Sequence, residues 1–165
     1  MGWLNKFSPR NAATTVADFS RLSPGDEIRS ADETWTVTAV LGYRSGEDQW
    51  PAAKLQRGGA VTWAVLEGDH VVRYDAITAQ VDAQGRSRWN GHTYVRDEAG
   101  TAVIDSAAGD VDVRPGDTLT YQVLRSADDP GAWLSVECWA GGFVEISVGR
   151  LWPVDDIVVK GERRR

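Results

Sequence analysis

The sequence predicts an all-β protein, either a mostly antiparallel sandwich or a partly open barrel, with at most one short N-terminal helix. Three observations predict this class. Apolar and polar side chains alternate along several runs, turn-forming Gly, Asn and Pro residues separate the runs, and β-branched and aromatic residues recur throughout. Alternation with period two indicates half-buried strands, and short strands with frequent turns are typical of sandwiches and barrels.

Size and composition place the chain among single-domain globular proteins. It has 165 residues, of which 42% are hydrophobic and 25% charged, as in ordinary soluble domains. Cys138 is the single cysteine, so an internal disulfide framework is excluded, and with His70 and His92 it makes too small a set for a zinc site. We predict no metal and no cofactor. With neither a membrane-length apolar run nor a signal peptide, the sequence predicts a soluble, cytoplasmic protein.

The predicted elements follow one another along the chain. Residues 1–19 are expected to form an N-terminal arm, with a short helix or an extended segment over 14–22. The first strong strand pattern is at 34–41, where apolar side chains alternate with threonines. Val61, Trp63 and Val65 mark another strand, and residues 133–148 predict a closing hairpin.

The domain organisation admits two interpretations. Residues 20–160 are predicted to be a single β-rich domain, and a basic tail follows at 161–165. A Pro-Gly-Asp turn precedes a strand both at 24–26 and at 115–117. Either units 20–76 and 111–160 are related by duplication and joined by 77–110, or the two turns are alike because Pro and Gly suit adjacent turn positions.

The charge balance argues against nucleic-acid binding. Eighteen Lys and Arg residues stand against 24 Asp and Glu, which gives a net charge of -6. An acidic body repels phosphate, and nucleic-acid binders usually carry a basic patch. The tail Arg163–Arg165 is either a solvated terminus or a contact for an anionic membrane surface. Peripheral membrane association, through this tail or through a protein partner, therefore stays open.

The hairpin over 133–148 has a register that its apolar residues dictate. Leu134, Val136 and Cys138 can share one face with Val144, Ile146 and Val148 only if Cys138 pairs with Val144, because a one-residue slip moves one set to the other face. This register leaves a three-residue loop, Ala140-Gly141-Gly142, which is a common hairpin type. We expect Cys138 to be a small buried side chain rather than a nucleophile.

The opposite face of this hairpin is the candidate ligand site. The register places Glu137 opposite Glu145 and Trp139 opposite Phe143, with Trp133 on the same face. Facing carboxylates are destabilising unless something compensates them. Either Arg125 or Arg150 bridges the pair, or both glutamates point into water, or a ligand such as a cation or a sugar binds there. Close carboxylates also occur in retaining glycosidases, so a hydrolase is a further alternative.

No sequence motif predicts catalysis. Phosphate-binding glycine loops, the nucleophile elbow and the zinc-protease motif are all absent. A Ser-His-Asp triad would need His70 or His92, and both lie at predicted hairpin edges without supporting neighbours. The prediction for catalytic residues is therefore none, and we expect a protein that is not an enzyme.

Several segments together resemble a bacterial family, domain of unknown function four-one-seven-eight. The resemblance covers about residues 20–160 and departs from the family at 49–55, where Pro51 fits only an edge strand or a bulge. It implies a soluble β-rich accessory domain with no established catalytic residues. It also implies genes near those of membrane stress and polyamine synthesis, hence an envelope-associated partner or a polyamine ligand. The matching segments are 22–28, 35–37, 63–68, 134–137 and 145–149.

Three functions are carried forward from the sequence. The first is a non-catalytic accessory or interaction domain with an unidentified protein partner and a link to bacterial envelope stress; it predicts an exposed interaction surface and no deep polar pocket. The second is a small-ligand binding domain using Glu137, Glu145, Trp139, Phe143 and Trp133; it predicts a concave site at that hairpin. The third is a hydrolase using the carboxylate pair, which predicts both glutamates in one cleft.

Overall fold

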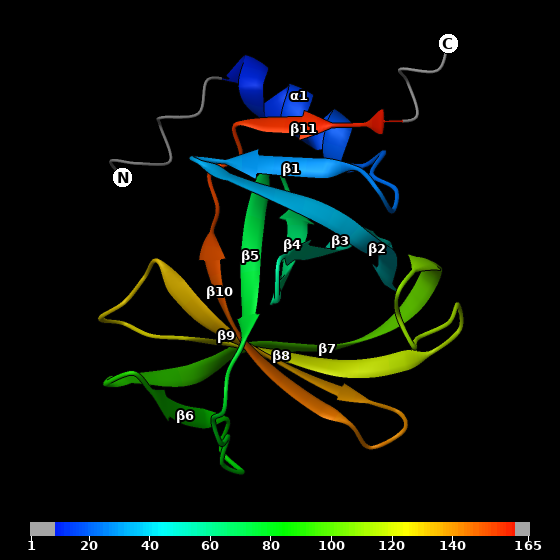
Figure 1. Ribbon diagram of the computed structural model, residues 1–165. Coiled ribbons are helices and arrows are strands. Elements are labelled where there is room, and N and C mark those ends of the chain that lie inside the picture. The colour runs from blue at the N-terminus through cyan, green and yellow to red at the C-terminus, as the bar shows by residue number, and fades with distance from the viewer. Residues whose placement is uncertain (1–8, 161–165) are drawn as a thin grey trace.

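The computed structural model describes residues 9–160, which form one helix and eleven strands of a single antiparallel sheet (Figure 1). The helix α1 (Pro9–Phe19) lies in the predicted N-terminal arm and begins earlier than expected; the basic tail at 161–165 lies outside the described residues. The strands are β1 (Glu27–Ser30), β2 (Glu33–Ser45), β3 (Asp48–Arg57), β4 (Ala60–Glu67), β5 (His70–Ala76), β6 (Arg86–Trp89), β7 (His92–Gly109), β8 (Thr118–Arg125), β9 (Ala132–Trp139), β10 (Val144–Leu151) and β11 (Asp156–Val158).

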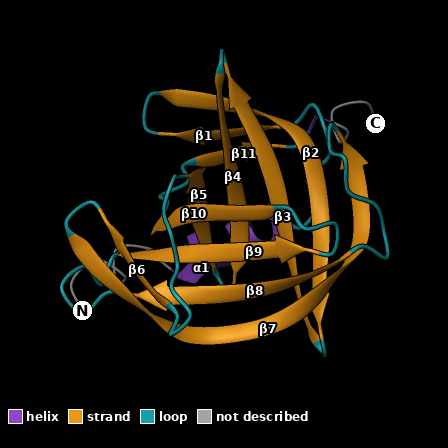
Figure 2. Ribbon diagram, turned by 90° about the horizontal axis from the view of Figure 1, so that it is seen from below, coloured by secondary structure: helices purple, strands orange, loops and turns teal. Residues whose placement is uncertain are grey.

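Eight of these strands close into a barrel. They follow the order β2, β3, β4, β5, β10, β9, β8 and β7, and β2 also pairs with β7. Figure 2 shows β10, β9, β8 and β7 side by side along one wall. The prediction of an all-β fold is confirmed. Of the two architectures left open, the structure has the barrel, and the β2–β7 ladder removes the open edges that a sandwich would keep.

Proline is tolerated inside this barrel because of where it lies. Pro51 is opposite Gly42 of β2, whereas the pairing of β3 with β4 begins one residue later, at Ala52. Proline has no N–H to donate and is confined to strand edges or bulges. The missing donor therefore falls where β3 has a neighbour on one side only.

A bulge in β2 divides one alternating run between two hydrophobic cores. Val37 is opposite Leu55 and Ala39 is opposite Lys54, so Thr38 is an extra residue. Such an insertion shifts the alternation of faces. Val37 packs outside the barrel, while Leu41 and Tyr43 pack inside it. The predicted strand at 34–41 is present, but its apolar side chains serve both sides of the barrel wall.

A cap of α1, β1 and β11 covers one side of the barrel. The first of the two cores lies between this cap and the barrel wall. Strands β1 and β11 extend the sheet from β2, and α1 lies against them (Figure 1). Phe19, Ile28 and Trp35 are almost fully buried there with Leu55 and Leu66 of the barrel wall. Burying each such side chain contributes on the order of 2 kcal/mol, so the cap is an integral part of the fold.

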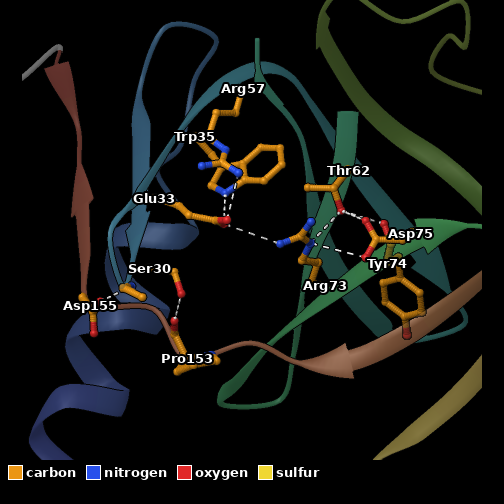
Figure 3. A network of polar contacts seen from close by, with 11 residues as sticks. Ser30, Glu33, Trp35, Arg57, Thr62, Arg73, Tyr74, Asp75, Pro153 and Asp155 are labelled. Carbon is orange, nitrogen blue, oxygen red and sulfur yellow. Dashed lines mark hydrogen bonds and ion pairs between the residues drawn. The ribbon is translucent and has the colours of Figure 1, made fainter. Parts of the chain in front are cut away.

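Charged groups fasten Trp35 to the barrel wall (Figure 3). The Arg73 guanidinium lies 4.8 Å from the centroid of the Trp35 ring, and that of Arg57 lies 5.2 Å from it. Glu33 accepts a hydrogen bond from Trp35 Nε1 at 3.0 Å and forms a salt bridge to Arg57 at 2.9 Å. Arg73 also pairs with Asp75 at 3.4 Å. The basic groups in this cluster are therefore matched by carboxylates.

A third core lies on the outside of β8, β9 and β10, under β6 and the first part of β7. Leu134, Val136 and Val148, predicted to share a buried face, are buried here around Tyr94. Cys138 is only partly buried at the margin of this core. Val144 is 54% exposed, so its predicted burial is wrong; the covering layer ends before it.

The two Pro-Gly-Asp turns have the same structure. In each, the aspartate carboxylate accepts a 2.8 Å hydrogen bond from the backbone N–H three residues earlier. Gly25 N–H donates to Val37 O, and Gly116 N–H donates to Ile104 O, both at 2.8 Å. The turns thus dock in the same manner on β2 and β7. The duplication itself stays a prediction, because turn chemistry alone accounts for this likeness.

A substitution at Gly109, where β7 approaches β2 closely, would test how much the stability of the fold depends on the β2–β7 ladder. A Cβ there would lie 2.2 Å from Thr38 O and 2.9 Å from Pro24 Cγ, at a φ of +89°. The left-handed conformation alone costs a non-glycine residue roughly 1–2 kcal/mol. We expect Gly109→Ala to lower the free energy of unfolding by that amount plus the steric clash, about 3 kcal/mol or more in total, as measured by urea denaturation.

The matched control is Gly116→Ala, which has a φ of +97° and open space around the added methyl group. It should lose only the conformational part, about 1–2 kcal/mol. Equal losses for the two variants would mean that the close approach at Gly109 does not matter for closure.

Candidate functional site

The interior of the barrel holds a cavity of about 1500 Å³. All eight barrel strands contribute lining residues. Val61 and Phe143, which are 53% and 65% exposed, lie on its rim, so the cavity is continuous with the surface. Typical small-molecule sites have about 300–1,000 Å³. The space is therefore ample for a small organic ligand.

The closing hairpin has the predicted register. Cys138 is opposite Val144, and Glu137 is opposite Glu145. Trp139 N–H donates to Phe143 O at 2.9 Å, which closes the three-residue loop, and Gly142 at φ +89° supplies its left-handed position. Outward packing of the apolar face turns the other face into the barrel.

All five residues proposed as a ligand site therefore line the same cavity. They are Glu137, Glu145, Trp139, Phe143 and Trp133. Directly opposite positions on neighbouring strands have Cβ atoms about 4.5–5.5 Å apart, so the two glutamates are within reach of one small cationic group. Whether they bind a ligand stays a prediction.

Aromatic rings form much of the wall beside the glutamates. Tyr43 and Trp50 stack with centroids 5.5 Å apart and planes 5° from parallel, and Tyr121 meets Trp50 edge-on at 6.1 Å. Gly100 makes room for this arrangement, because a Cβ there would lie 2.6 Å from the Tyr121 hydroxyl oxygen. Ring faces carry negative potential and attract cations.

Neither glutamate of the facing pair has a compensating partner among residues 9–160: no salt bridge or hydrogen bond reaches the carboxylate of Glu137 or Glu145. The alternative that an arginine bridges the pair is wrong. Arg125 pairs with Asp97 at 2.9 Å, and Arg150 pairs with Asp129 at 3.5 Å. Two carboxylates thus face each other inside the barrel, and no basic side chain within residues 9–160 neutralises them.

This enclosure changes the acidity of the site. Burial in the barrel, followed by the charge of Glu145, raises the pKa of Glu137 from 4.5 to about 7. Burial also raises the pKa of Glu145 above its usual range. The pKa of Tyr43 is raised well above 10 by burial and by the charges of both glutamates. The pair consequently holds a proton near neutral pH that a bound cation would displace.

The charge of the cavity as a whole is acidic. Among residues 9–160, eight carboxylates line it, against two basic side chains, Lys54 and Arg125. Both basic groups are already paired with aspartates, Lys54 with Asp110 at 3.5 Å and Arg125 with Asp97. The acidic lining residues are Asp48, Glu67, Glu98, Asp110, Asp112, Asp117, Glu137 and Glu145.

Sequence reasoning missed several lining residues that the alternation carries. Tyr43 continues the run of 35–41, and Glu67 continues the run of Val61, Trp63 and Val65. Extending each alternating run by one step would have grouped Tyr43 with Leu41 and Glu67 with Val65, but not shown that this face lines a cavity.

The histidines lie away from the cavity. His70 is 3.1 Å from Asp69, and His92 is 3.3 Å from Asp128; neither lines the cavity. Within the part of the chain that the structure describes, no group of three or more His, Cys, Asp or Glu side chains is arranged to hold a metal ion. Nor does any helix of that part have the length and apolarity needed to cross a membrane.

Fold and site together define a closed eight-stranded antiparallel barrel with an acidic, aromatic interior. Residues 23–153 match the family described as Domain of unknown function (DUF4178), and the chain belongs to this family. The resemblance seen in the sequence is thereby confirmed. No curated protein and no solved structure gives a significant match.

The raised pKa of Glu137 makes a stability prediction. The folded protein holds a proton that the unfolded chain has lost between pH 4.5 and about 7, so the free energy of unfolding falls as the pH rises through this window. Glu137→Gln removes the titrating group. We expect the variant to gain about 3 kcal/mol over wild type at pH 8 and less than about 1 kcal/mol at pH 5, measured by urea denaturation at both values.

Glu47→Gln is the control, because Glu47 is an exposed glutamate in the turn between β2 and β3. Its difference from wild type should be similar at pH 5 and pH 8. A Glu137→Gln variant that behaved in the same way would show that burial of Glu137 carries no electrostatic penalty.

Proposed function

We propose that this protein is a non-catalytic binding domain whose barrel interior holds a small organic cation. The observation that carries the proposal is the facing pair Glu137 and Glu145, enclosed among aromatic rings without a cationic partner among the described residues. Carboxylates out of bulk water are unfavourable unless they are paired or protonated. An entering cation would supply the missing partner.

The surrounding wall supports a cation rather than an anion or a purely apolar ligand. Eight carboxylates and two already paired basic groups line the cavity, which gives it a negative potential. Rings of Tyr43, Trp50 and Tyr121 flank the space, and an ammonium group over such a ring gains about 0.5–2 kcal/mol. Protonated amines, polyamines among them, have the matching charge and apolar carbon.

The cavity also favours binding over a purely structural or interaction role. An interaction domain without a ligand was expected to lack a deep polar pocket, and the cavity of about 1500 Å³ with its acidic groups supports the binding role instead. A protein partner that senses the bound ligand is compatible with the proposal. A bacterial cytoplasmic location fits it as well, since protonated amines are abundant solutes there and the single cysteine needs no oxidising compartment.

A ligand screen on matched variants tests the proposal. Wild type and Glu137→Gln/Glu145→Gln would be tested with butylammonium, tetramethylammonium, spermidine, Mg²⁺, Ca²⁺ and a neutral oligosaccharide. A ligand that binds only the native state raises the melting temperature. At a concentration of 100 times its Kd it adds about 2.7 kcal/mol to the free energy of unfolding. We expect a dose-dependent rise with at least one organic cation in wild type and none in the double variant.

The control for lost charge is Asp32→Asn/Asp156→Asn, which removes two exposed carboxylates from the cap. It should respond to the cations as wild type does. A response to the oligosaccharide alone, or a response that both double variants lose equally, would contradict a cation site at the glutamate pair.

The acidity of the site predicts how binding depends on pH. A cation binds best when both carboxylates are ionised, and the pKa of Glu137 is about 7. The Kd of an organic cation should therefore be about tenfold larger at pH 6 than at pH 8, with a proton released on binding near pH 7. Isothermal titration calorimetry in two buffers of different ionisation enthalpy measures both; a Kd independent of pH would place the cation elsewhere.

A further inference from the structure

A second acidic position lies in the same cavity, far from the glutamate pair. Val61 and Glu67 are at the two ends of β4, and both line the cavity. Strands rise about 3.3 Å per residue, so the cavity runs for about 20 Å along this strand. Val61 lies near the mouth with Phe143, whereas Glu67 lies at the other end with Arg125 and Glu98.

The Glu67 carboxylate is held in place by two aromatic side chains. The Tyr74 hydroxyl donates a hydrogen bond to Glu67 Oε1 and accepts one from Trp133 Nε1 at 2.9 Å. Gly149 allows these two rings to meet, because a Cβ there would lie 2.6 Å from Tyr74 Cε1 and 2.8 Å from Trp133 Nε1. Glu67 is exposed to solvent at the end of β4, and these hydrogen bonds fix the direction of its carboxylate.

Glu67 also lacks a basic partner in the part of the chain that the structure describes. Its second carboxylate oxygen takes no hydrogen bond, and no salt bridge reaches it. Arg125 lies at this end but pairs with Asp97 at 2.9 Å and stacks over the Trp133 ring at 5.4 Å. Glu98 adds further negative charge here. This end of the cavity is therefore a second acidic position, more exposed to solvent than the glutamate pair and partly offset by the charge of Arg125.

The two acidic positions are separated by open, polar space. Glu137 and Trp133 are four residues apart on β9, about 13 Å at the usual rise per residue, and Trp133 adjoins the Tyr74 hydroxyl that holds Glu67. Between them, Ser135 lies opposite Ser147. Both serines line the cavity, and their small side chains take up little of the space between the two positions.

We propose that the ligand is a linear molecule with a protonated amine at each end, one bound by Glu137 and Glu145 and the other by Glu67. This rests on the proposed function and extends it. The intervening carbon chain lies against the aromatic wall, where its burial adds to the affinity. The spacing of the two acidic positions selects the length of the chain.

A series of linear diamines measures this selection. Diaminobutane, diaminohexane, diaminooctane and diaminodecane would be compared by calorimetry with the monoamine of each length. The monoamine series corrects for the affinity that any added carbon gives in an apolar cavity. We expect the ratio of monoamine to diamine Kd to be near one for the shortest chain and about tenfold or more for the longest chains, because the second amine then binds within one molecule.

Variants assign each end of the ligand. Glu67→Gln keeps an oxygen that can accept from Tyr74, so the fold is retained; it should abolish the diamine advantage, measured against the monoamine of the same length on the same variant. Asp69→Asn, two residues away and outside the cavity, should keep the advantage. Glu137→Gln/Glu145→Gln should weaken monoamines and diamines alike.

Two outcomes separate this inference from the function on which it rests. If monoamines bind through Glu137 and Glu145 but diamines of every length gain nothing, the two-ended ligand is overturned and the cation site stands. If no amine binds to wild type, both are overturned. A diamine advantage that survives Glu67→Gln also overturns the assignment of the second amine.

Discussion

Closure of the barrel through the β2–β7 ladder determines which side chains of the other strands face the interior and which face outward. An open sheet would leave Glu137 and Glu145 on a wetted face, where like charges repel weakly and water satisfies them. Closure places the same pair in a confined space with aromatic walls. The raised pKa of Glu137 follows from that enclosure first and from its neighbour second. The site is therefore a property of the topology as much as of the hairpin.

The cost of keeping carboxylates inside is offset by packing elsewhere. Aliphatic and aromatic side chains fill three separate cores, two of them on the outer surface of the barrel under the cap and under β6. Because the barrel wall is buried on its outside over much of its area, its interior need not be filled to hold the strands together. This explains how a chain of 165 residues can keep a cavity of about 1500 Å³.

The local alternation of apolar and polar residues allowed part of this structure to be predicted from the sequence. The pairing of strands far apart in the chain could not be predicted in this way. The hairpin register could be predicted because a slip would expose Leu134 and Val136, and its five candidate residues do share one cavity. Closure could not, because pairing of β2 with β7 joins segments about 60 residues apart. The bulge at Thr38 leaves the alternation of buried residues unbroken, so nothing in the pattern shows that Leu41 and Val37 serve different cores.

Glu67 illustrates how the position of a residue in the fold can differ from what its place in the sequence suggests. It ends a strand, precedes a glycine and would serve as an ordinary turn residue in most sheets. Its position acquires meaning only from Tyr74 and Trp133, which come from different strands and meet because Gly149 lacks a side chain. The Tyr74 hydroxyl and Trp133 Nε1 are both used in the hydrogen bonds that hold one carboxylate oxygen of Glu67. Since the hydrogen bond to Glu67 is exposed to solvent and such bonds stabilise a fold only modestly, the arrangement chiefly fixes the orientation of the Glu67 carboxylate.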